Sequence, residues 1–367
     1  MTSVHRLDDP RIFQKECRTL AAAGYDVVLV GTGSSYTVDD GVRVKTVPLP
    51  ATRLERMTRV LWRLYRLADA EAADIYHFHD PELLVMAWIM KARGRNVIFD
   101  AHEDLPAQIL GKDWIPASYR RSVVRLVALS EKASLRILDH VIAADPTIAA
   151  RFPPSKTVIV QNFPRTAEFQ SADAPAYGTR APVVAYVGGV SRMRGVEEMV
   201  RAIGRVSPEL DARLVLAGSL DPASLLDELD GVPGWDRTAY LGWQGPEQLR
   251  QLLSSARVGL VTLHPLPNYL TAFPTKLFEY MAAGIPVVAS DFPLWRQIVT
   301  DAQCGFLVDP MNPSAIAEAV EFLLRHPSEA QLMGERGRNA ACSKYDWKTQ
   351  GEKLVRVYED VLQGAEA

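Results

Sequence analysis

The chain is poor in cysteine and has no long apolar segment. It holds three cysteines in 367 residues, Cys17, Cys304 and Cys342, which lie far apart and match no metal-ligand spacing. We therefore expect reduced thiols rather than disulfides. No apolar run approaches the roughly 20 residues that a membrane-spanning helix needs, and the first residues do not form a secretion signal. These absences lead us to expect a cytoplasmic protein.

Several functional motifs are also missing. A net charge of −3 and a pI of about 6.2, with no recognition motif, exclude a nucleic-acid partner. A Gly-x-Ser-x-Gly nucleophile elbow is absent. Gly31 and Gly33 follow a predicted strand, but Tyr36 stands at the third glycine position of the dinucleotide fingerprint. No Asp-x-Asp pair follows a strand and no compact ligand set is present, so we expect neither a metal nor a cofactor.

Apolar runs of strand length alternate with helical patterns, which predicts an α/β fold with parallel sheets. A length of 367 residues favours two domains. We expect two doubly wound, Rossmann-like domains that face an interdomain cleft, with ligands bound where strands end. The predicted strands are Asp26–Val30, Val42–Val47, Asp74–Phe78, Asn96–Ala101, His140–Ala143 and Val158–Gln161, then Val183–Val187, Arg213–Leu216, Thr238–Leu241, Val258–Val261, Pro286–Ala289 and Gly305–Val308.

The predicted domains are residues 1–165 and 182–345, joined by a linker at 166–181 that is rich in alanine and proline. We expect the last helix, 346–367, to pack back toward the first domain. Only Met1 to His5 precede the first predicted helix, Asp9–Ala23, which is short for a first strand. Either the true start lies upstream or the first strand is short.

The most informative segment is 268–290, which combines a turn, a helix with one carboxylate, a glycine stop and a strand. Pro274 suits a first helical position, after which unpaired amides point toward an anion. Lys276 and Glu279 share a face of this helix. Gly284 then ends it. The alternative is a surface helix with an ion pair.

A second candidate anion site is the loop 188–195, which follows a predicted strand. Gly188 and Gly189 allow close backbone approach, and Arg192 and Arg194 offer positive charge to phosphate oxygens. With Lys276, these arginines can surround a diphosphate. The alternative is a turn with solvated arginines.

Two histidines follow predicted strands in the first half of the chain. Each has carboxylates beside it: His79 with Asp80 and Glu82, and His102 with Glu103 and Asp104. Such groups can bind sugar hydroxyls or move protons, although a histidine at a strand end can also be structural. A further helix, Arg53–Arg66, interleaves five arginines with apolar residues. It is either a solvated face or a contact for an anionic membrane surface or acceptor.

Taken together, these segments resemble glycosyltransferase family 4, the retaining nucleotide-sugar enzymes of GT-B fold. The likeness extends over nearly the whole chain. It is carried by the motifs Arg-Ile-Phe-x-Lys-Glu at 11–16, Ala-Gly-Tyr-Asp-Val at 23–27, His-Asp-Pro-Glu-Leu at 79–83, Asp-Ala-His-Glu at 100–103, Gly-Ile-Pro-Val-Val-Ala-Ser at 284–290 and Asp-Trp at 346–347.

The resemblance implies that the second domain binds the donor and the first domain the acceptor. Glu279 matches the second glutamate of the family's E-x7-E pattern and would contact the ribose. Arg194 takes the place of the lysine in the phosphate-binding pair. His102 would orient the transferred sugar. The remaining residues implied at the donor are Gly188, Gly189, Lys276, Phe273, Pro274 and Thr275, and those on the acceptor side are His79, Asp80 and Glu103.

Two positions depart from the family pattern. The first glutamate of E-x7-E is replaced by Thr271, which, like Asn268 or Tyr269, can contact the donor sugar in its place. The arginine of the phosphate pair is replaced by Gly189, and Arg192 can supply the missing charge. We expect metal-independent, retaining transfer from a nucleotide diphosphate sugar, with UDP favoured and GDP next, to a hydroxyl of a glycan, lipid-linked or other glycoconjugate acceptor. The alternatives are a nucleotide-sugar epimerase of the same fold and a non-catalytic partner subunit.

Overall fold

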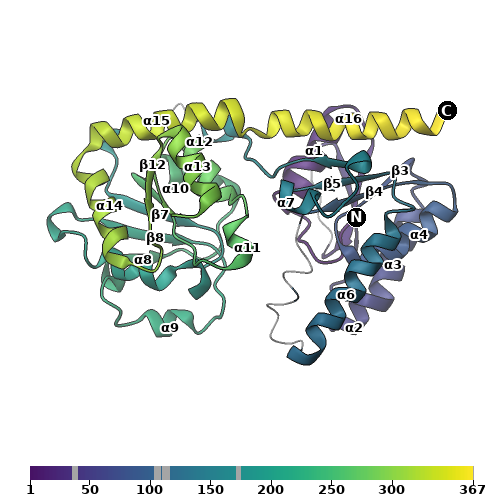
Figure 1. The fold of residues 1–367 in the computed structure, drawn as a ribbon, viewed down its shortest axis with the longest axis horizontal. Helices are drawn as coiled ribbons and strands as arrows, with labels where there is room; N and C mark the ends of the chain where they lie inside the picture. Colours follow the sequence, from purple (N-terminus) through teal and green to yellow (C-terminus); the bar gives the residue numbers. More distant parts are fainter. Residues whose placement is uncertain (35–39, 103–108, 110–115, 171–174, 367) are drawn as a thin grey trace. The chain divides into compact units, whose positions relative to one another are not determined.

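The computed structural model describes residues 1–34, 40–102, 109, 116–170 and 175–366, which form two α/β units (Figure 1). Unit 1 comprises Met1–Asn162 and Trp347–Ala367, and unit 2 comprises Phe163–Asp346. The described part of the predicted linker, 166–181, belongs to unit 2. Thr166, Tyr177 and Arg180 are buried in unit 2, where Arg180 donates to the carbonyl of Ala256.

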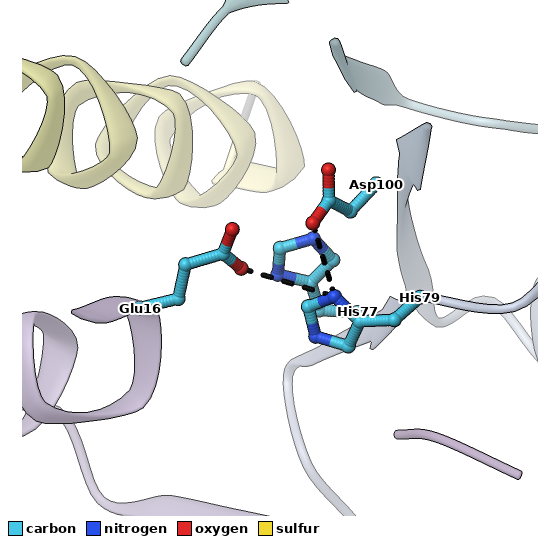
Figure 2. Close-up of side chains that lie close together, drawn as sticks. All are labelled: Glu16, His77, His79 and Asp100. Carbon is cyan, nitrogen blue, oxygen red and sulfur yellow. Dashed lines mark hydrogen bonds and ion pairs between the residues drawn. The ribbon is translucent and has the colours of Figure 1, made fainter. Parts of the chain in front are cut away.

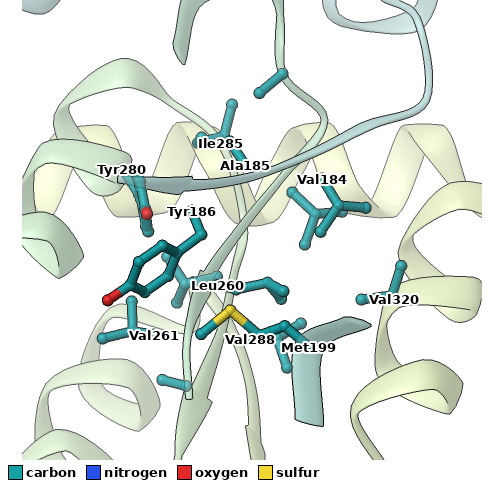
Figure 3. Packing of buried hydrophobic residues seen from close by; sticks show 14 of the residues in the cluster. Val184, Ala185, Tyr186, Met199, Leu260, Val261, Tyr280, Ile285, Val288 and Val320 are labelled. Carbon is teal, nitrogen blue, oxygen red and sulfur yellow. The ribbon is translucent and has the colours of Figure 1, made fainter. Parts of the chain in front are cut away.

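Unit 2 is built on one parallel sheet in the order β12-β11-β10-β7-β8-β9. Both faces of this sheet are covered, so its strands are nearly continuous apolar runs. Tyr186, Leu260 and Tyr280 pack in the resulting core, shown in Figure 3. The strands are β7 (Val183–Val187), β8 (Arg213–Ala217), β9 (Thr238–Tyr240), β10 (Val258–Val261), β11 (Val287–Ser290) and β12 (Gly305–Val308).

Helices fill the connections of unit 2. One of them, α15, was not predicted from the sequence, because its buried face consists of small residues such as Gly334 and Gly337. The longer helices are α8 (Val196–Ile203), α10 (Pro246–Ser255), α12 (Thr275–Ala283), α13 (Pro293–Ala302), α14 (Pro313–Arg325) and α15 (Pro327–Lys344). The shorter elements are η5 (Thr166–Phe169), η6 (Tyr177–Thr179), η7 (Arg192–Arg194), η8 (Pro208–Leu210), α9 (Leu225–Leu229), η9 (Trp235–Arg237) and α11 (Pro267–Leu270).

Unit 1 has two parallel sheets rather than one. Four strands pair in the order β3-β4-β5-β6, and β1 pairs separately with β2. The register places Phe78 opposite Phe99 and Ala101 opposite Ala143, so β3, β4 and β5 end at the same edge. The strands are β1 (Val27–Thr32), β2 (Val42–Val47), β3 (Ile75–Phe78), β4 (Asn96–Ala101), β5 (His140–Ala143) and β6 (Thr157–Ile159).

The helices of unit 1 include the last helix of the chain. This helix begins at Trp347, whose indole N–H donates to Thr19 Oγ1 at 2.8 Å, and its apolar face packs with Ile98 and Ile142. Among the described residues, no helix combines the length and apolarity that crossing a membrane requires. The helices are η1 (Ile12–Cys17), α1 (Arg18–Ala22), α2 (Arg53–Glu55), η2 (Arg56–Val60), α3 (Leu61–Asp69), η3 (Pro81–Leu83), α4 (Leu84–Ala92), α6 (Ala117–Ser134), α7 (Pro146–Ala149), η4 (Pro154–Lys156) and α16 (Trp347–Glu366).

Candidate active site

The strand order of unit 2 reverses beside β7, whose neighbours are β8 and β10. In open parallel sheets, ligands bind at such a switch point, outside the carboxyl ends of the strands. The segment that leaves β7 there is Gly188–Gly189, followed by the short turn η7 and by Gly195 in the left-handed region, at φ 75°. The loop 188–195, where an anion site was predicted, therefore lies at the switch point of the sheet.

Gly188 and Gly189 form the floor of a small basic cradle. Gly188 has φ 112°, and a Cβ added to it would lie 3.2 Å from Lys276 Nζ and 3.6 Å from Arg194 Nη1. A Cβ on Gly189 would lie 3.2 Å from the same Arg194 nitrogen. Because Gly188 and Gly189 have no side chains, Lys276 and Arg194 can both lie close to the backbone of these two residues. Such an arrangement suits phosphate oxygens.

Lys276 is buried, and its Nζ has no hydrogen-bond partner among the described residues. The ammonium lies 3.8 Å from the ring centroid of Tyr186, a cation–π contact. Burial, followed by the nearby charge of Arg194, lowers the pKa of Lys276 well below its usual value, while Glu279 acts in the opposite direction. A bound anion would relieve both unfavourable effects.

Helix α12 carries Lys276 and Glu279 and begins one residue later than predicted. Pro274 has ψ 114° and is the cap that precedes the helix, so its predicted place as first helical residue is wrong. Thr275 is the first residue, and the carbonyl of Pro274 accepts from the amide of Leu277 at 3.0 Å. The helix is fixed to β7 by Tyr280, whose hydroxyl accepts from the amide of Val187 at 2.9 Å.

The other residues predicted at the donor lie around this helix. Arg192 turns to surface carboxylates, pairing with Glu197 at 3.2 Å and also with Glu228. Phe273 is half-buried beside Phe278, with ring centroids 6.3 Å apart. The exposed Thr271 lies at the end of α11, before the turn into α12.

A histidine–carboxylate contact near the switch point was not predicted from the sequence. His264 follows β10, and its Nε2 lies 3.1 Å from Glu198 Oε2 on α8. The amide of His264 also donates to the carbonyl of Met193 in η7, which ties the two loops together. The signal available in the sequence was a histidine placed shortly after a buried strand.

In unit 1, His79 and His102 lie beside Asp100, the residue in β4 that precedes Ala101, and Figure 2 shows Asp100 with His77, His79 and Glu16. His79 Nδ1 lies 3.1 Å and His102 Nδ1 3.5 Å from Asp100 Oδ2. Arg11 donates to both carboxylate oxygens of Asp100, at 2.8 and 2.9 Å. Burial opposes the ionisation of Asp100, but Arg11 together with the hydrogen bonds from His102 and His79 outweighs it and holds the pKa of Asp100 well below its usual value.

His102 is the outermost member of this cluster, and it contacts a residue that was not predicted. Its Nε2 lies 3.0 Å from His5 Nε2, which in turn lies 3.3 Å from Asp80 Oδ1. Asp80 also accepts from the hydroxyl of Thr2 and the amide of Ser3. A pocket of about 30 Å³ lies over this group and is lined in part by His5, His79, Asp80 and His102. Glu103 lies outside the described residues.

Glu16, His77, His79 and Asp100 place ligand atoms within 4.8 Å of one another, a spacing that can hold a metal ion. The fit is poor, because Arg11 Nε already lies 2.8 Å from Asp100 and 2.9 Å from Glu16. A metal cation would therefore be placed beside a buried guanidinium. Burial and Asp100 also raise the pKa of Glu16, which favours its neutral form.

The fold and these two sites define a two-domain α/β protein that presents a basic cradle on one domain and a histidine–carboxylate cluster on the other. Residues 170–340 match the family model for glycosyl transferases group 1, and residues 11–162 match the glycosyl transferase 4-like domain. The chain belongs to these glycosyltransferases, the family 4 type of GT-B fold. The family and fold class predicted from the sequence are thereby confirmed.

Relatives of known name agree with this assignment. The chain is 24% identical to phosphatidyl-myo-inositol mannosyltransferase of Mycobacterium leprae, over 95% of this chain and 88% of that protein. It is 28% identical to an uncharacterized glycosyltransferase of Methanocaldococcus jannaschii, over 49% of this chain and 45% of that protein. The chain spans less than half the length of that relative and of three others that it matches.

Solved structures are similar over almost the whole chain. Sucrose-phosphate synthase from Thermosynechococcus elongatus superposes with a TM-score of 0.75 at 21% identity, over 96% of this chain and 93% of that one. Anabaena HepE in complex with UDP and glucose gives a TM-score of 0.70 at 16% identity, over 94% and 95%. At these identities the similarity establishes the fold alone.

Proposed function

We propose that this glycosyltransferase moves a sugar from a nucleotide diphosphate sugar, UDP before GDP, to a hydroxyl of a glycan, lipid-linked or other glycoconjugate acceptor. The observation that carries the proposal is the convergence of Lys276 and Arg194 on Gly188–Gly189 at the switch point of unit 2. Lys276 and Arg194 lie beside backbone that carries no side chains, and Lys276 Nζ is buried with no hydrogen-bond partner in the described chain. This arrangement suits a diphosphate. UDP is favoured because HepE, which has a similar fold, was solved in complex with UDP.

The reaction that fits these groups proceeds with retention. The bond between the anomeric carbon and the diphosphate oxygen breaks as the acceptor oxygen bonds to the same face, and the leaving phosphate takes the acceptor proton. Arg194, Lys276 and the first amides of α12 stabilise the growing phosphate charge. A preorganised donor of this kind contributes about 3–4 kcal/mol to the transition state. His102 orients the sugar, and no metal is needed.

Nucleotide binding is the first test. In a thermal-shift panel of UDP, GDP, ADP and dTDP, with the corresponding sugars, we expect stabilisation by the diphosphates and loss of that stabilisation in Lys276→Met. An exposed lysine outside the site provides the control variant Lys344→Met. A protein that no nucleotide stabilises would support the alternative of a non-catalytic partner. Isomerisation of a nucleotide-sugar in the absence of acceptor would support an epimerase.

Stereochemistry and metal dependence need separate measurements. Proton NMR of the product is expected to show the anomeric configuration of the donor, and inversion would refute the mechanism. Activity is expected to persist in excess EDTA. Activity that is lost in EDTA and restored by Mg²⁺ would show that the cations of the protein do not suffice.

We further propose that the acceptor is reached at an anionic membrane surface through residues 53–69 of unit 1. The inner face of these helices is buried through Leu64 and Tyr65, while Leu54, Met57 and Trp62 point outward with at least half of their surface exposed. Exposed arginines at 59, 63 and 66 lie in the same stretch. Apolar side chains flanked by arginines are typical of helices that lie in a membrane interface.

Vesicle sedimentation tests this contact. We expect the protein to bind vesicles that contain phosphatidylglycerol but not pure phosphatidylcholine vesicles, and Trp62→Ser combined with Met57→Ser to abolish binding. Leu332→Ser, a similarly exposed residue of unit 2, is the matched control. Equal binding by all variants would place the contact elsewhere. This outcome is independent of nucleotide binding, which is measured without vesicles.

A further inference from the structure

The segment 262–270 leaves β10 at the switch point of unit 2 and lies against the turn η7. The two backbones are in close contact, because a Cβ on Gly195 would collide with the carbonyl oxygen of Thr262. Further along the segment, the amide of His264 donates to the carbonyl of Met193 in η7 at 3.1 Å. The backbone of this segment therefore holds η7 in place from one side.

Tyr269 lies near the end of this segment, in the short helix α11. The sequence left Asn268, Tyr269 and Thr271 open as contacts of the donor. Asn268 and Thr271 are exposed, whereas Tyr269 is half-buried and packs against the core of unit 2. Its amide donates to the carbonyl of Leu266 at 2.9 Å. Tyr269 is therefore the one of these three residues whose side chain the fold holds in place.

The side chain of Arg194 makes hydrogen-bonding contacts with two tyrosine hydroxyls, those of Tyr186 and Tyr269. A guanidinium group has donors only, so both hydroxyl oxygens accept from Arg194. The hydroxyl of Tyr186 donates its own proton to the carbonyl of Gly189 at 2.8 Å. The chain of contacts from Arg194 through Tyr186 to Gly189 thus fixes the guanidinium beside the glycine loop.

The hydroxyl of Tyr269 differs from that of Tyr186 in one respect. Within the described part of the chain, it makes a contact with Arg194 but donates no hydrogen bond of its own. A phenolic hydroxyl has one proton to donate besides the lone pairs with which it accepts. When the oxygen accepts from a cation, this proton points away from that cation. A phosphate that binds Arg194 therefore lies within reach of the Tyr269 proton.

We propose that Tyr269 is a further phosphate-binding residue of the donor site, an inference that rests on the function proposed above. Its hydroxyl donates a hydrogen bond to the β-phosphate that Arg194 binds, which is the phosphate that leaves as the sugar is transferred. The hydroxyl keeps its proton throughout the reaction. Its hydrogen bond strengthens as negative charge grows on the leaving phosphate.

A neutral donor suits this position better than a third cation would. Lys276 is buried, and the nearby charge of Arg194 already disfavours its ammonium form. Another positive charge beside these two would add repulsion in the free protein. A tyrosine hydroxyl supplies a hydrogen bond to the phosphate without adding charge.

Calorimetry of Tyr269→Phe, which removes the hydroxyl and keeps the ring, tests this contact. The ligands are UDP and UMP, which lacks the β-phosphate; another diphosphate and its monophosphate replace them if the thermal-shift panel selects that nucleotide. We expect Tyr269→Phe to bind UDP about 10- to 100-fold more weakly and UMP less than about twofold more weakly, since a hydrogen bond to a charged group is lost. The matched control is Tyr177→Phe, which loses a hydroxyl that donates to the carbonyl of Arg257 at 2.7 Å and should bind both ligands normally.

The outcomes separate this inference from the proposed function. If the natural protein binds UDP and Tyr269→Phe binds it equally well, Tyr269 does not contact the phosphate and the proposed function still stands. If no nucleoside diphosphate binds the natural protein, the proposed function itself fails. An equal loss of affinity for UDP and UMP would also overturn the contact with the β-phosphate, because both ligands share the nucleoside and the α-phosphate.

Phosphorus NMR of bound UDP distinguishes a direct contact from an effect through Arg194. We expect the resonance of the β-phosphate to differ between the natural protein and Tyr269→Phe, and the resonance of the α-phosphate to stay in place. Identical β-phosphate resonances in the two proteins would refute the direct contact, even if the affinity for UDP has fallen.

Discussion

The lowered pKa of Lys276 makes a prediction that couples donor binding to proton uptake. In the free protein, burial and Arg194 disfavour the charged form of Lys276. A diphosphate bound over Gly188 would lie beside Nζ and favour the ammonium. Above the lowered pKa, binding should therefore take up as much as one proton per site. Across that range, affinity should fall by about tenfold per unit of pH, or about 1.4 kcal/mol.

Two substitutions separate this effect from a general loss of charge. In Lys276→Arg the guanidinium stays protonated, so we expect binding without proton uptake. In Lys276→Met the cation is lost, and affinity should fall by about 2–5 kcal/mol, the usual result of truncating one partner of a buried charge pair.

Calorimetry at pH 8.5 measures the coupling directly. The binding enthalpy of UDP is measured in Tris, which has a large ionisation enthalpy, and in other phosphate-free buffers whose ionisation enthalpy is small. The dependence of the binding enthalpy on the buffer gives the number of protons taken up. We expect a clear dependence in the natural protein and none in Lys276→Arg. The same dependence in both, or none in either, would show that Lys276 is not the group that titrates.

Three further outcomes follow from the structure. Arg194→Ala should lower turnover by about 100-fold or more. Arg192→Ala should lower turnover by less than about tenfold, because Arg192 already pairs with surface carboxylates. Steady-state assays measure both. At pH 7, Glu16→Gln should change the free energy of unfolding by less than about 1 kcal/mol. Asp100→Asn should lower that free energy by about 3 kcal/mol, because Arg11 would lose its compensating charge. Urea unfolding, with hydrogen exchange measured in unit 1, tests both variants. Burial lowers the pKa of His79 to about 4, so as the pH falls the unfolded chain takes up a proton at this residue before the folded chain does. The free energy of unfolding should therefore decrease by about 3 kcal/mol between pH 6.5 and about 4. In His79→Gln this decrease should be smaller.

The sequence predicted the strands of both units well, because buried parallel strands are short, nearly continuous apolar runs. The helix α15 was missed for a related reason. Its buried positions are Ala330, Gly334, Gly337 and Ala341, which produce little apolar periodicity. They are small because α15 lies close to other backbone: a Cβ on Gly334 would collide with the carbonyl of Gly284. Close backbone packing of this kind leaves only a weak signal in a single sequence.

The candidate sites were predicted in part. Residues near one another in sequence, such as Gly188, Gly189 and Arg194, could be grouped because one loop carries them. The different surroundings of Arg192 and Arg194 could not be predicted, because both residues belong to the same short turn. The role of Arg11 was also hidden, since its partner Asp100 lies 89 residues away and only the fold brings them together.

The two sites differ in how their buried charges are balanced, and this difference bears on which ligand each can bind. In unit 1, Arg11 is compensated by Asp100 within hydrogen-bond distance, so the cluster is complete without a charged ligand and suits neutral hydroxyls. In unit 2, Lys276 has no hydrogen-bond partner among the described residues, and Arg194 adds positive charge beside it. A buried cation without compensation is costly, and a phosphate group reverses that cost on binding. The charge distribution therefore favours the anionic donor on unit 2 and a neutral acceptor hydroxyl on unit 1.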